Sequence, residues 1–148
     1  MTAKKKTAAK PAAKKSGWVF PVNAPYTMLD GFAEHKARGS VNPGLDFPKA
    51  VGAPVKACQG GVVTLANSVG AGAGGLMVVI NHGAGYTSEY LHLSKLNVKN
   101  GTKVVAGDVI GFVGGSGFGK PDHYGAHLHL AIKAKGKNVD PYEFLKEH

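Results

Sequence analysis

Short apolar runs separated by glycine-rich turns recur along this chain, and they predict β-strands. The continuous apolar run LMVVI (76–80) is typical of a strand covered on both faces. The run YTSEYLHLS (86–94) alternates apolar and polar positions, as a strand with one buried face does. Because NHGAG (81–85) between them has the composition of a tight turn, the two runs predict a β-hairpin.

Further strands are expected along most of the chain. The run WVFPV (18–22) predicts the first strand, and PVKACQGGVVTLA (54–66) predicts two short strands that bend at Gly60 and Gly61. Residues 95–114 alternate strand pieces with the turn sequences NG and AGD. No stretch carries a long helical period, so the pattern favours a protein built of short strands.

One short helix is expected at the C-terminal end, where Asp140 and Pro141 provide the residue types that begin a helix. A glycine-rich loop spans 114–125. The predicted fold class is therefore all-β: an antiparallel β-sandwich or small barrel, with a groove lined by long loops and a short C-terminal helix.

Two histidines interrupt the apolar run GAHLHLAI (125–132). Because side chains alternate between the faces of a strand, His127 and His129 are expected on one face. The opposite face would be buried and carries Leu128, Leu130 and Ile132. Two imidazoles side by side on one face indicate a metal or catalytic site.

Two other segments offer similar side chains. In EYLHLS the alternation places Tyr90, His92 and Ser94 on one face, with Leu91 and Leu93 on the other. In VNPGLDF (41–47) it places Asn42, Gly44 and Asp46 on one side, where the glycine would leave room for a ligand or an ion. Imidazole and carboxylate groups together suit zinc, which prefers nitrogen and oxygen ligands in tetrahedral arrangement.

Composition and charge divide the chain into two parts. Its 148 residues suffice for one domain, and the lone Cys58 excludes an internal disulfide. Six lysines lie within the first fifteen residues, which leave 12 basic and 9 acidic residues for the rest. We expect a disordered Lys/Ala-rich tail over 1–16, able to bind anionic polymers, and a folded domain over 17–148. No signal peptide and no membrane span are expected.

The order of these motifs resembles the lysostaphin/LytM-type zinc metallopeptidases, which cut peptide cross-links in bacterial peptidoglycan. The resemblance runs from about residue 31 to 145 through NPGLDF, GAPVKACQGGVV, MVVINHGAGYTSEYLHLS, VKNGTKVVAGDVIGFVG, GAHLHL and VDPYEFL. It implies a β-sandwich of the duplicated hybrid type with a groove above the sheet.

The resemblance also implies roles for particular residues. Asp46 and His129 take the places of metal ligands to a single Zn²⁺, His127 that of the general base, and His92 that of its catalytic partner. Zinc would activate water and polarise the scissile carbonyl, while His92 would stabilise the oxyanion or orient the water. Tyr90 and Tyr124 are predicted to contact substrate.

One departure concerns the metal site directly, because Asn42 stands where the family has its first zinc histidine. Three arrangements stay open. Asn42 ligates weakly through its amide oxygen, or the site is empty, or another histidine substitutes. His35 lies seven residues upstream of Asn42, and an extended link of that length reaches about 23 Å. Further departures are Ala126 and Ala131, which replace the family's proline and glutamate around the histidine pair.

The leading hypothesis is a monomeric zinc endopeptidase of peptidoglycan, made in the cytoplasm and acting on the wall after phage-type release or as part of a virion. The alternative is a catalytically degenerate domain of the same fold that serves as a wall-binding or virion structural module. A biotinyl or lipoyl carrier domain is disfavoured because no lysine has a methionine neighbour. A nucleic-acid-binding body is disfavoured by its small net charge.

Overall fold

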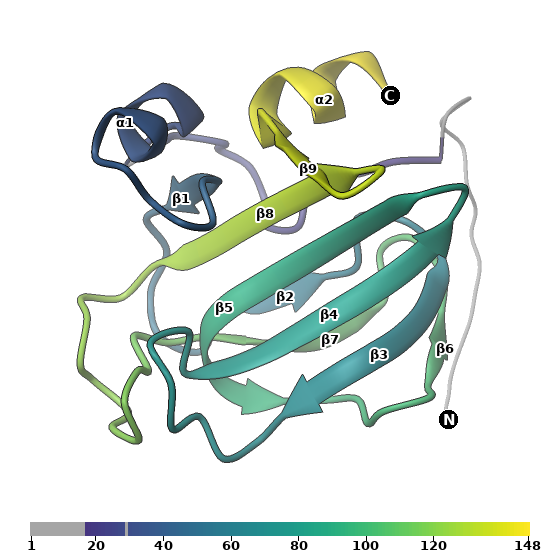
Figure 1. Cartoon of the computed structure of the whole chain (residues 1–148). Coiled ribbons are helices and arrows are strands. Elements are labelled where there is room, and N and C mark those ends of the chain that lie inside the picture. The colour runs from purple at the N-terminus through teal and green to yellow at the C-terminus, as the bar shows by residue number, and fades with distance from the viewer. Residues whose placement is uncertain (1–16, 29) are drawn as a thin grey trace.

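The computed structural model describes residues 17–28 and 30–148 (Figure 1). The predicted tail over 1–16 therefore lies outside the described residues. No helix in this part of the chain has the length and apolar character needed to cross a membrane. The elements follow in the order α1 (Phe32–Ala37), β1 (Leu45–Phe47), β2 (Pro54–Lys56), β3 (Gly61–Asn67), β4 (Leu76–Gly83), β5 (Tyr86–Leu96), β6 (Lys103–Val104), β7 (Val109–Val113), β8 (Leu128–Ala134), β9 (Lys137–Val139) and α2 (Pro141–Glu147).

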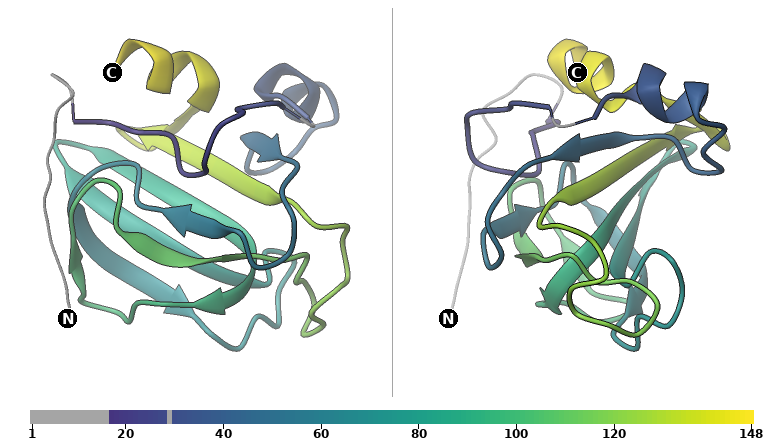
Figure 2. Two further views of the ribbon diagram at one scale, coloured as in Figure 1. Left: turned by 180° about the vertical axis from the view of Figure 1, so that it is seen from behind. Right: turned by 90° about the vertical axis from the view of Figure 1, so that its left-hand side faces the viewer.

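All strand pairs are antiparallel, and most strands follow one another across the sheet in the order β1-β8-β5-β4-β3-β6. The long strand β5 pairs with β8 and β4 and, near its end, with β7, which in turn pairs with β2. The pair β2–β7 consequently lies behind the main sheet, as the two views of Figure 2 show. The predicted antiparallel all-β class with a short terminal helix is confirmed.

Several predicted elements are confirmed in detail. The hairpin consists of β4 and β5, the two strands on either side of Gly60 are β2 and β3, and α2 begins after Asp140. The Asp140 carboxylate accepts hydrogen bonds from the amides of Tyr142 and Glu143, as an N-cap residue does. Cys58 is fully buried, and burial raises the pKa of its thiol to about 12.

Other expectations are wrong. Residues 18–22 form no strand, although Trp18 and Val22 are buried and belong to the hydrophobic core. The run 76–80 is covered on one face and only half-covered on the other. The short helix α1 was not expected, because six residues are too few to show a helical period. It lies beside β1 at one edge of the sheet (Figure 1).

Gly44 allows the chain to approach β8 closely just before β1 begins. A Cβ atom at this position would lie 2.1 Å from the carbonyl oxygen of Leu130 and 2.9 Å from His129 Nε2. The expected space beside Gly44 is therefore filled by the backbone of β8, and the proposal of a ligand there is wrong. The glycine instead permits the contact that brings β1 against the histidine strand.

We predict that Gly44→Ala destabilises the protein by about 2 kcal/mol or more, because either the strand β1 or the backbone of β8 must shift. Urea denaturation would measure the free energy of unfolding. Gly72→Ala is the matched control, since a Cβ atom there meets nothing within 4 Å. Equal stability of the two variants would contradict the close approach.

Candidate metal centre and active site

The pairing of β1 with β8 places Asp46 directly opposite His129. The Asp46 Oδ1 atom lies 2.7 Å from His129 Nδ1, and both side chains are largely buried. The two residues are 83 positions apart in the sequence, so this contact exists only in the folded protein. It supplies one carboxylate and one imidazole, both of which the sequence predicts as metal ligands.

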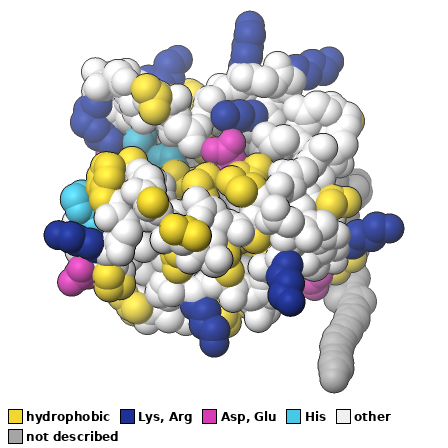
Figure 3. Space-filling view, turned by 60° about the horizontal axis from the view of Figure 1, so that its bottom comes forward, with side chains coloured by type: hydrophobic (Ala, Val, Ile, Leu, Met, Phe, Trp, Pro, Cys, Tyr) yellow, Lys and Arg dark blue, Asp and Glu magenta, His cyan; other side chains and the backbone are white. Residues whose placement is uncertain are grey.

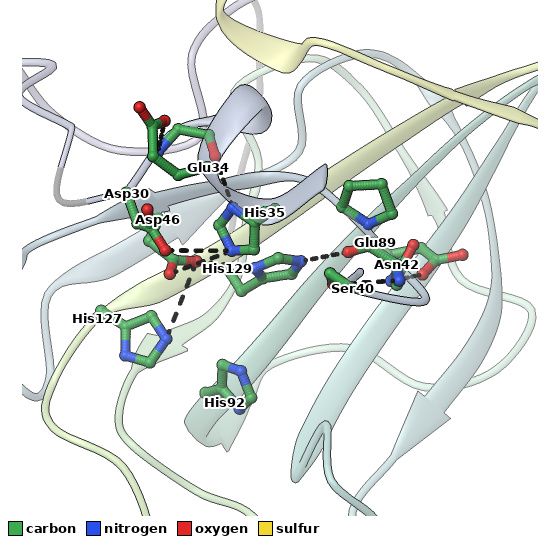
Figure 4. Close-up of polar contacts among 12 residues, drawn as sticks. Asp30, Glu34, His35, Ser40, Asn42, Asp46, Glu89, His92, His127 and His129 are labelled. Carbon is green, nitrogen blue, oxygen red and sulfur yellow. Dashed lines mark hydrogen bonds and ion pairs between the residues drawn. The ribbon is translucent and has the colours of Figure 1, made fainter. Parts of the chain in front are cut away.

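A second imidazole reaches the same carboxylate from helix α1. His35 Nε2 lies 3.4 Å from Asp46 Oδ2, and the rings of His35 and His129 are 4.9 Å apart (Figure 4). An antiparallel bridge ties this segment to β1, because the Asp46 amide donates to the Asp30 carbonyl at 2.8 Å. The Asp30 carboxylate also pairs with Arg38 Nη2 at 2.6 Å, at the end of the helix.

Backbone carbonyls determine which ring nitrogen of each histidine faces Asp46. His35 Nδ1 lies 2.7 Å from the carbonyl oxygen of Gly31, and His129 Nε2 lies 3.0 Å from that of Asn42. Because a carbonyl oxygen can only accept a hydrogen bond, each of these nitrogens must carry the proton. The other nitrogens, His35 Nε2 and His129 Nδ1, face the carboxylate and would offer their lone pairs to a metal ion bound there.

These three side chains fit a zinc ion by their chemistry. Their ligand atoms all lie within 4.8 Å of one another, and they comprise two imidazole nitrogens and one carboxylate oxygen. A catalytic zinc site takes three protein ligands and keeps the fourth position for water or substrate. Histidine ligands that donate their other N–H to a carbonyl are typical of such sites.

The Asp46 carboxyl is suited to this role by its charge. In the metal-free protein, burial raises its pKa, but the hydrogen bond with His129 and the positive charge that His129, His127 and His35 carry when protonated outweigh that effect. The pKa of the Asp46 carboxyl therefore lies below the ordinary value of an aspartate. The carboxylate is consequently ionised at neutral pH and available as an anionic ligand.

The Asn42 side chain points away from this cluster. Its Nδ2 donates to Glu89 Oε1 at 2.9 Å, and its Oδ1 accepts from Asn138 Nδ2 at 2.8 Å. In Figure 4 Asn42 and Glu89 lie on one side of the His129 ring, and Asp46 lies on the other. The structure does not bring the predicted ligand Asn42 to the cluster, and of the three open arrangements it favours the one with His35.

The remaining pair of histidines lies next to the cluster. The rings of His127 and His92 are 4.8 Å apart, and His127 Nε2 is 4.0 Å from Asp46 Oδ1. Each Nδ1 lies within hydrogen-bond distance of a carbonyl oxygen, that of Gly125 for His127 and that of Ser116 for His92. The free Nε2 of both rings is therefore an acceptor, and the structure brings together all four predicted or alternative histidines.

The backbone of His92 departs from regular strand geometry. Its φ of 65° lies in the left-handed region, which is unusual for a non-glycine residue. The pairing of β4 with β5 shifts register here, since Leu76 faces Leu93 whereas Val78 faces Tyr90. The extra residue turns His92 towards the site.

This bulge corrects two expectations. Tyr90 and His92 do not share a face, because the bulge interrupts the alternation between them. Tyr90 is fully buried in the core, and its hydroxyl accepts a hydrogen bond from the Cys58 amide and another from Ser88. The predicted contact of Tyr90 with substrate is therefore wrong.

Tyr124 lies at the site as expected. Its ring centroid is 4.5 Å from that of His92 and 6.2 Å from that of His127. Its hydroxyl donates to the Ala73 carbonyl at 3.1 Å, which links the loop after β7 to the loop before β4. Histidine side chains reach the surface in Figure 3 between patches of hydrophobic side chains.

The arrangement of two imidazoles and a carboxylate beside a second imidazole pair is typical of metal-dependent hydrolytic enzymes. Comparison with known families agrees, because residues 40–141 match peptidase family M23. The chain belongs to this family. The match includes Asn42, Asp46 and the histidines of β5 and β8, whereas His35 precedes it.

Two curated relatives illustrate the similarity. The chain is 36% identical over 129 residues to a lipoprotein NlpD/LppB homolog of Pseudomonas aeruginosa, covering 87% of this chain and 40% of that protein. It is 35% identical over 126 residues to the peptidoglycan DD-endopeptidase ShyA of Vibrio cholerae, covering 82% and 28%. The chain thus spans less than half the length of these relatives.

Solved structures show the same fold. A zinc-containing peptidase from Vibrio cholerae superposes with a TM-score of 0.68 at 32% identity, covering 82% of this chain and 37% of the other. The catalytic domain of lysostaphin from Staphylococcus simulans gives a TM-score of 0.61 at 32% identity, covering 84% and 89%. The resemblance to lysostaphin-type peptidases is confirmed.

Burial of His92 predicts an acid-sensitive stability. Burial lowers the pKa of its imidazole to about 4, from the ordinary histidine value of 6.5, despite the hydrogen bond with Ser116. Between these pH values the unfolded chain binds the proton and the folded protein does not, so stability falls as the pH falls. For metal-free protein we expect a loss on the order of 3 kcal/mol from this group, complete near pH 4.

Urea denaturation of chelator-treated protein at pH 7 and near pH 4 measures this loss. The variant His92→Gln lacks the titrating group and should show a smaller change between the two pH values. His82, whose pKa is also lowered by burial, is present in both proteins and does not affect the comparison. An identical pH dependence in wild type and variant would contradict the assignment.

Proposed function

We propose that this protein is a zinc-dependent endopeptidase that cleaves peptide cross-links of bacterial peptidoglycan. The convergence of His35 Nε2, Asp46 and His129 Nδ1, with His127 and His92 alongside, is the observation that carries the proposal. A zinc-containing peptidase with the same fold supports the metal. The similarity to a peptidoglycan DD-endopeptidase supports the substrate class.

In this proposal His35, Asp46 and His129 hold the ion. When bound, zinc would lower the pKa of a water molecule towards about 7 and polarise the carbonyl of the scissile peptide bond. The chain's own contribution is orientation, because the Gly31 and Asn42 carbonyls fix both ligand rings before the ion arrives.

His127 is suited to move the proton. Its Nδ1–H donates to the Gly125 carbonyl at 2.7 Å, so the unprotonated Nε2 faces the cluster and can accept a proton from the attacking water. The same nitrogen can then give that proton to the leaving amine, which restores the free base. This is the cycle expected of a general base that becomes a general acid.

His92 orients the water in this mechanism. With its pKa near 4 it is neutral at physiological pH, and its single N–H is used on the Ser116 carbonyl. Its Nε2 can accept a hydrogen bond but cannot donate one to a developing oxyanion. Of the two roles that the sequence leaves open for His92, the geometry supports orientation of the water.

The degenerate alternative, a wall-binding or structural module, rests on Asn42 in place of a histidine. His35 weighs against this alternative, because its imidazole lies next to Asp46, whereas the Asn42 side chain is bonded to Glu89. The two functions differ in metal content and in catalysis, so they can be separated by variants at these two positions and at His127.

We predict that His35→Ala weakens zinc affinity by at least about 100-fold, since it removes a metal ligand. Asn42→His should not strengthen zinc binding, because the side chain at position 42 lies on the far side of His129. Competition with a chromophoric chelator measures both. His123→Ala, at an exposed histidine outside the cluster, is the matched control. Stronger zinc binding and new activity in Asn42→His would support the degenerate module.

His127→Ala should separate binding from chemistry. We expect it to retain zinc, because His127 is outside the ligand set, and to lose between about 10²- and 10⁴-fold in the rate of peptidoglycan cleavage. Turbidity of purified cell walls, followed with and without chelator, measures the rate. A zinc-loaded wild-type protein that leaves walls intact would refute the enzyme, and full activity in the variant would refute the role of His127.

A further inference from the structure

A partly buried polar cluster lies behind the metal centre and has no role in the mechanism so far. It consists of Asn42, Glu89, Lys133 and Asn138, which we call the Asn42 clamp. Asn42 Nδ2 donates to Glu89 Oε1 at 2.9 Å, and Asn138 Nδ2 donates to Asn42 Oδ1 at 2.8 Å and to the Pro43 carbonyl at 2.9 Å. The second Glu89 oxygen lies 3.2 Å from Lys133 Nζ. Both hydrogen-bonding groups of the Asn42 amide are thus satisfied.

The clamp lies on the central strands of the sheet. Glu89 belongs to β5, Lys133 to β8 and Asn138 to β9, and these strands pair with one another. Only 14% of the Glu89 side chain is exposed, so its carboxylate is held by the sheet. Asn42, in contrast, lies in the irregular segment between α1 and β1, which has no strand partner of its own. The clamp therefore attaches a loop residue to rigid structure.

The backbone of the clamped residue touches the metal centre. The Asn42 carbonyl oxygen accepts the hydrogen bond from His129 Nε2 at 3.0 Å. This bond fixes the tautomer of His129 and the direction of its Nδ1 towards Asp46. Among the described residues, this is the only hydrogen bond from His129 Nε2 to a backbone carbonyl. A shift of residue 42 would remove it.

We propose that Glu89 and Asn138 are positioning residues, which act through Asn42 to fix His129 for metal binding. The inference rests on the zinc site proposed above. It also gives Asn42 a role, because asparagine provides one donor for the Glu89 carboxylate and one acceptor for the Asn138 amide. Asn42, which stands where the family has a zinc histidine, thus supports the ligand His129.

The test compares two replacements of Glu89 in the full-length protein. Glu89→Ala removes the acceptor for Asn42, and we expect zinc affinity to fall about tenfold, the low end for an indirect ligand contact. Glu89→Gln keeps an acceptor oxygen while it removes the charge, and its affinity should stay within about twofold of wild type. Glu143→Ala, at an exposed carboxylate on α2, is the control and should leave affinity unchanged.

Two further measurements separate positioning from a purely structural role. In zinc-loaded wild type, the Nε2 proton of His129 should give a slowly exchanging NMR signal, and in Glu89→Ala the exchange should be faster. A structural role would lower the unfolding temperature of the metal-free variant and leave both zinc affinity and this signal unchanged. If Glu89→Ala does not fold, Asn138→Ala, which removes only the opposite side of the clamp, decides the question by the same measurements.

Unchanged zinc affinity in Glu89→Ala would overturn the positioning role alone. Equal losses in Glu89→Ala and Glu89→Gln would also overturn it, because they would indicate an effect of charge. A wild-type protein that binds no zinc would overturn the proposed metal site together with this inference.

Discussion

Backbone carbonyl oxygens fix the orientation of every imidazole at the site. Gly31, Asn42, Gly125 and Ser116 each accept a hydrogen bond from one histidine, and the opposite nitrogen of each ring points away from that carbonyl. His35, His127 and His129 surround Asp46, and His92 lies beside His127 (Figure 4). The acceptors are backbone carbonyls, so their positions are set by the fold. The histidine rings are therefore oriented before any ligand binds. Catalytic and metal sites depend on this kind of pre-organisation, because it avoids reorganisation when the ligand binds.

The same constraint explains how the proposed metal site can form without a histidine at position 42. A neutral histidine and an asparagine have the same charge, so replacement at position 42 leaves the electrostatics of the site similar. The imidazole is supplied instead by His35, on a helix held against β1 by the bridge between Asp30 and Asp46. Asn42 keeps its place next to His129 but contributes its carbonyl, while its side chain turns to Glu89. In the proposed site His35 is therefore the ligand, and Asn42 supports the ligand His129 through its carbonyl.

Much of this could be predicted from the sequence where local rules apply. The burial of Leu128, Leu130 and Ile132 and the capping residue Asp140 depend on near neighbours, and both predictions are confirmed, although His129 between the apolar positions is buried as well. Asp46 and His129 could be paired only through a resemblance, since 83 residues separate them. The position of His35 was one of three open alternatives, because it depends on a six-residue helix and a long-range backbone bridge. The burial of Tyr90 was missed for a related reason, since a bulge at His92 is not visible in an alternating pattern.

The residues that we propose to position His129 were also missed, because they carry no chemical signature in the sequence. Glu89 and Asn138 look like ordinary polar positions of strands, and their importance appears only when β5, β8 and β9 lie side by side. A signal for His35 does exist in the sequence, namely a histidine shortly before a segment that carries asparagine at a ligand position. Such a displaced histidine lies outside the stretch that matches the family, which begins at residue 40.

The most direct test of this account is a crystal structure of the zinc-loaded protein, with anomalous diffraction recorded at the zinc absorption edge. The account predicts one anomalous peak at about 2.0–2.2 Å from His35 Nε2, an oxygen of Asp46 and His129 Nδ1. A peak bonded to the Asn42 amide oxygen, with His35 outside the coordination sphere, would contradict it.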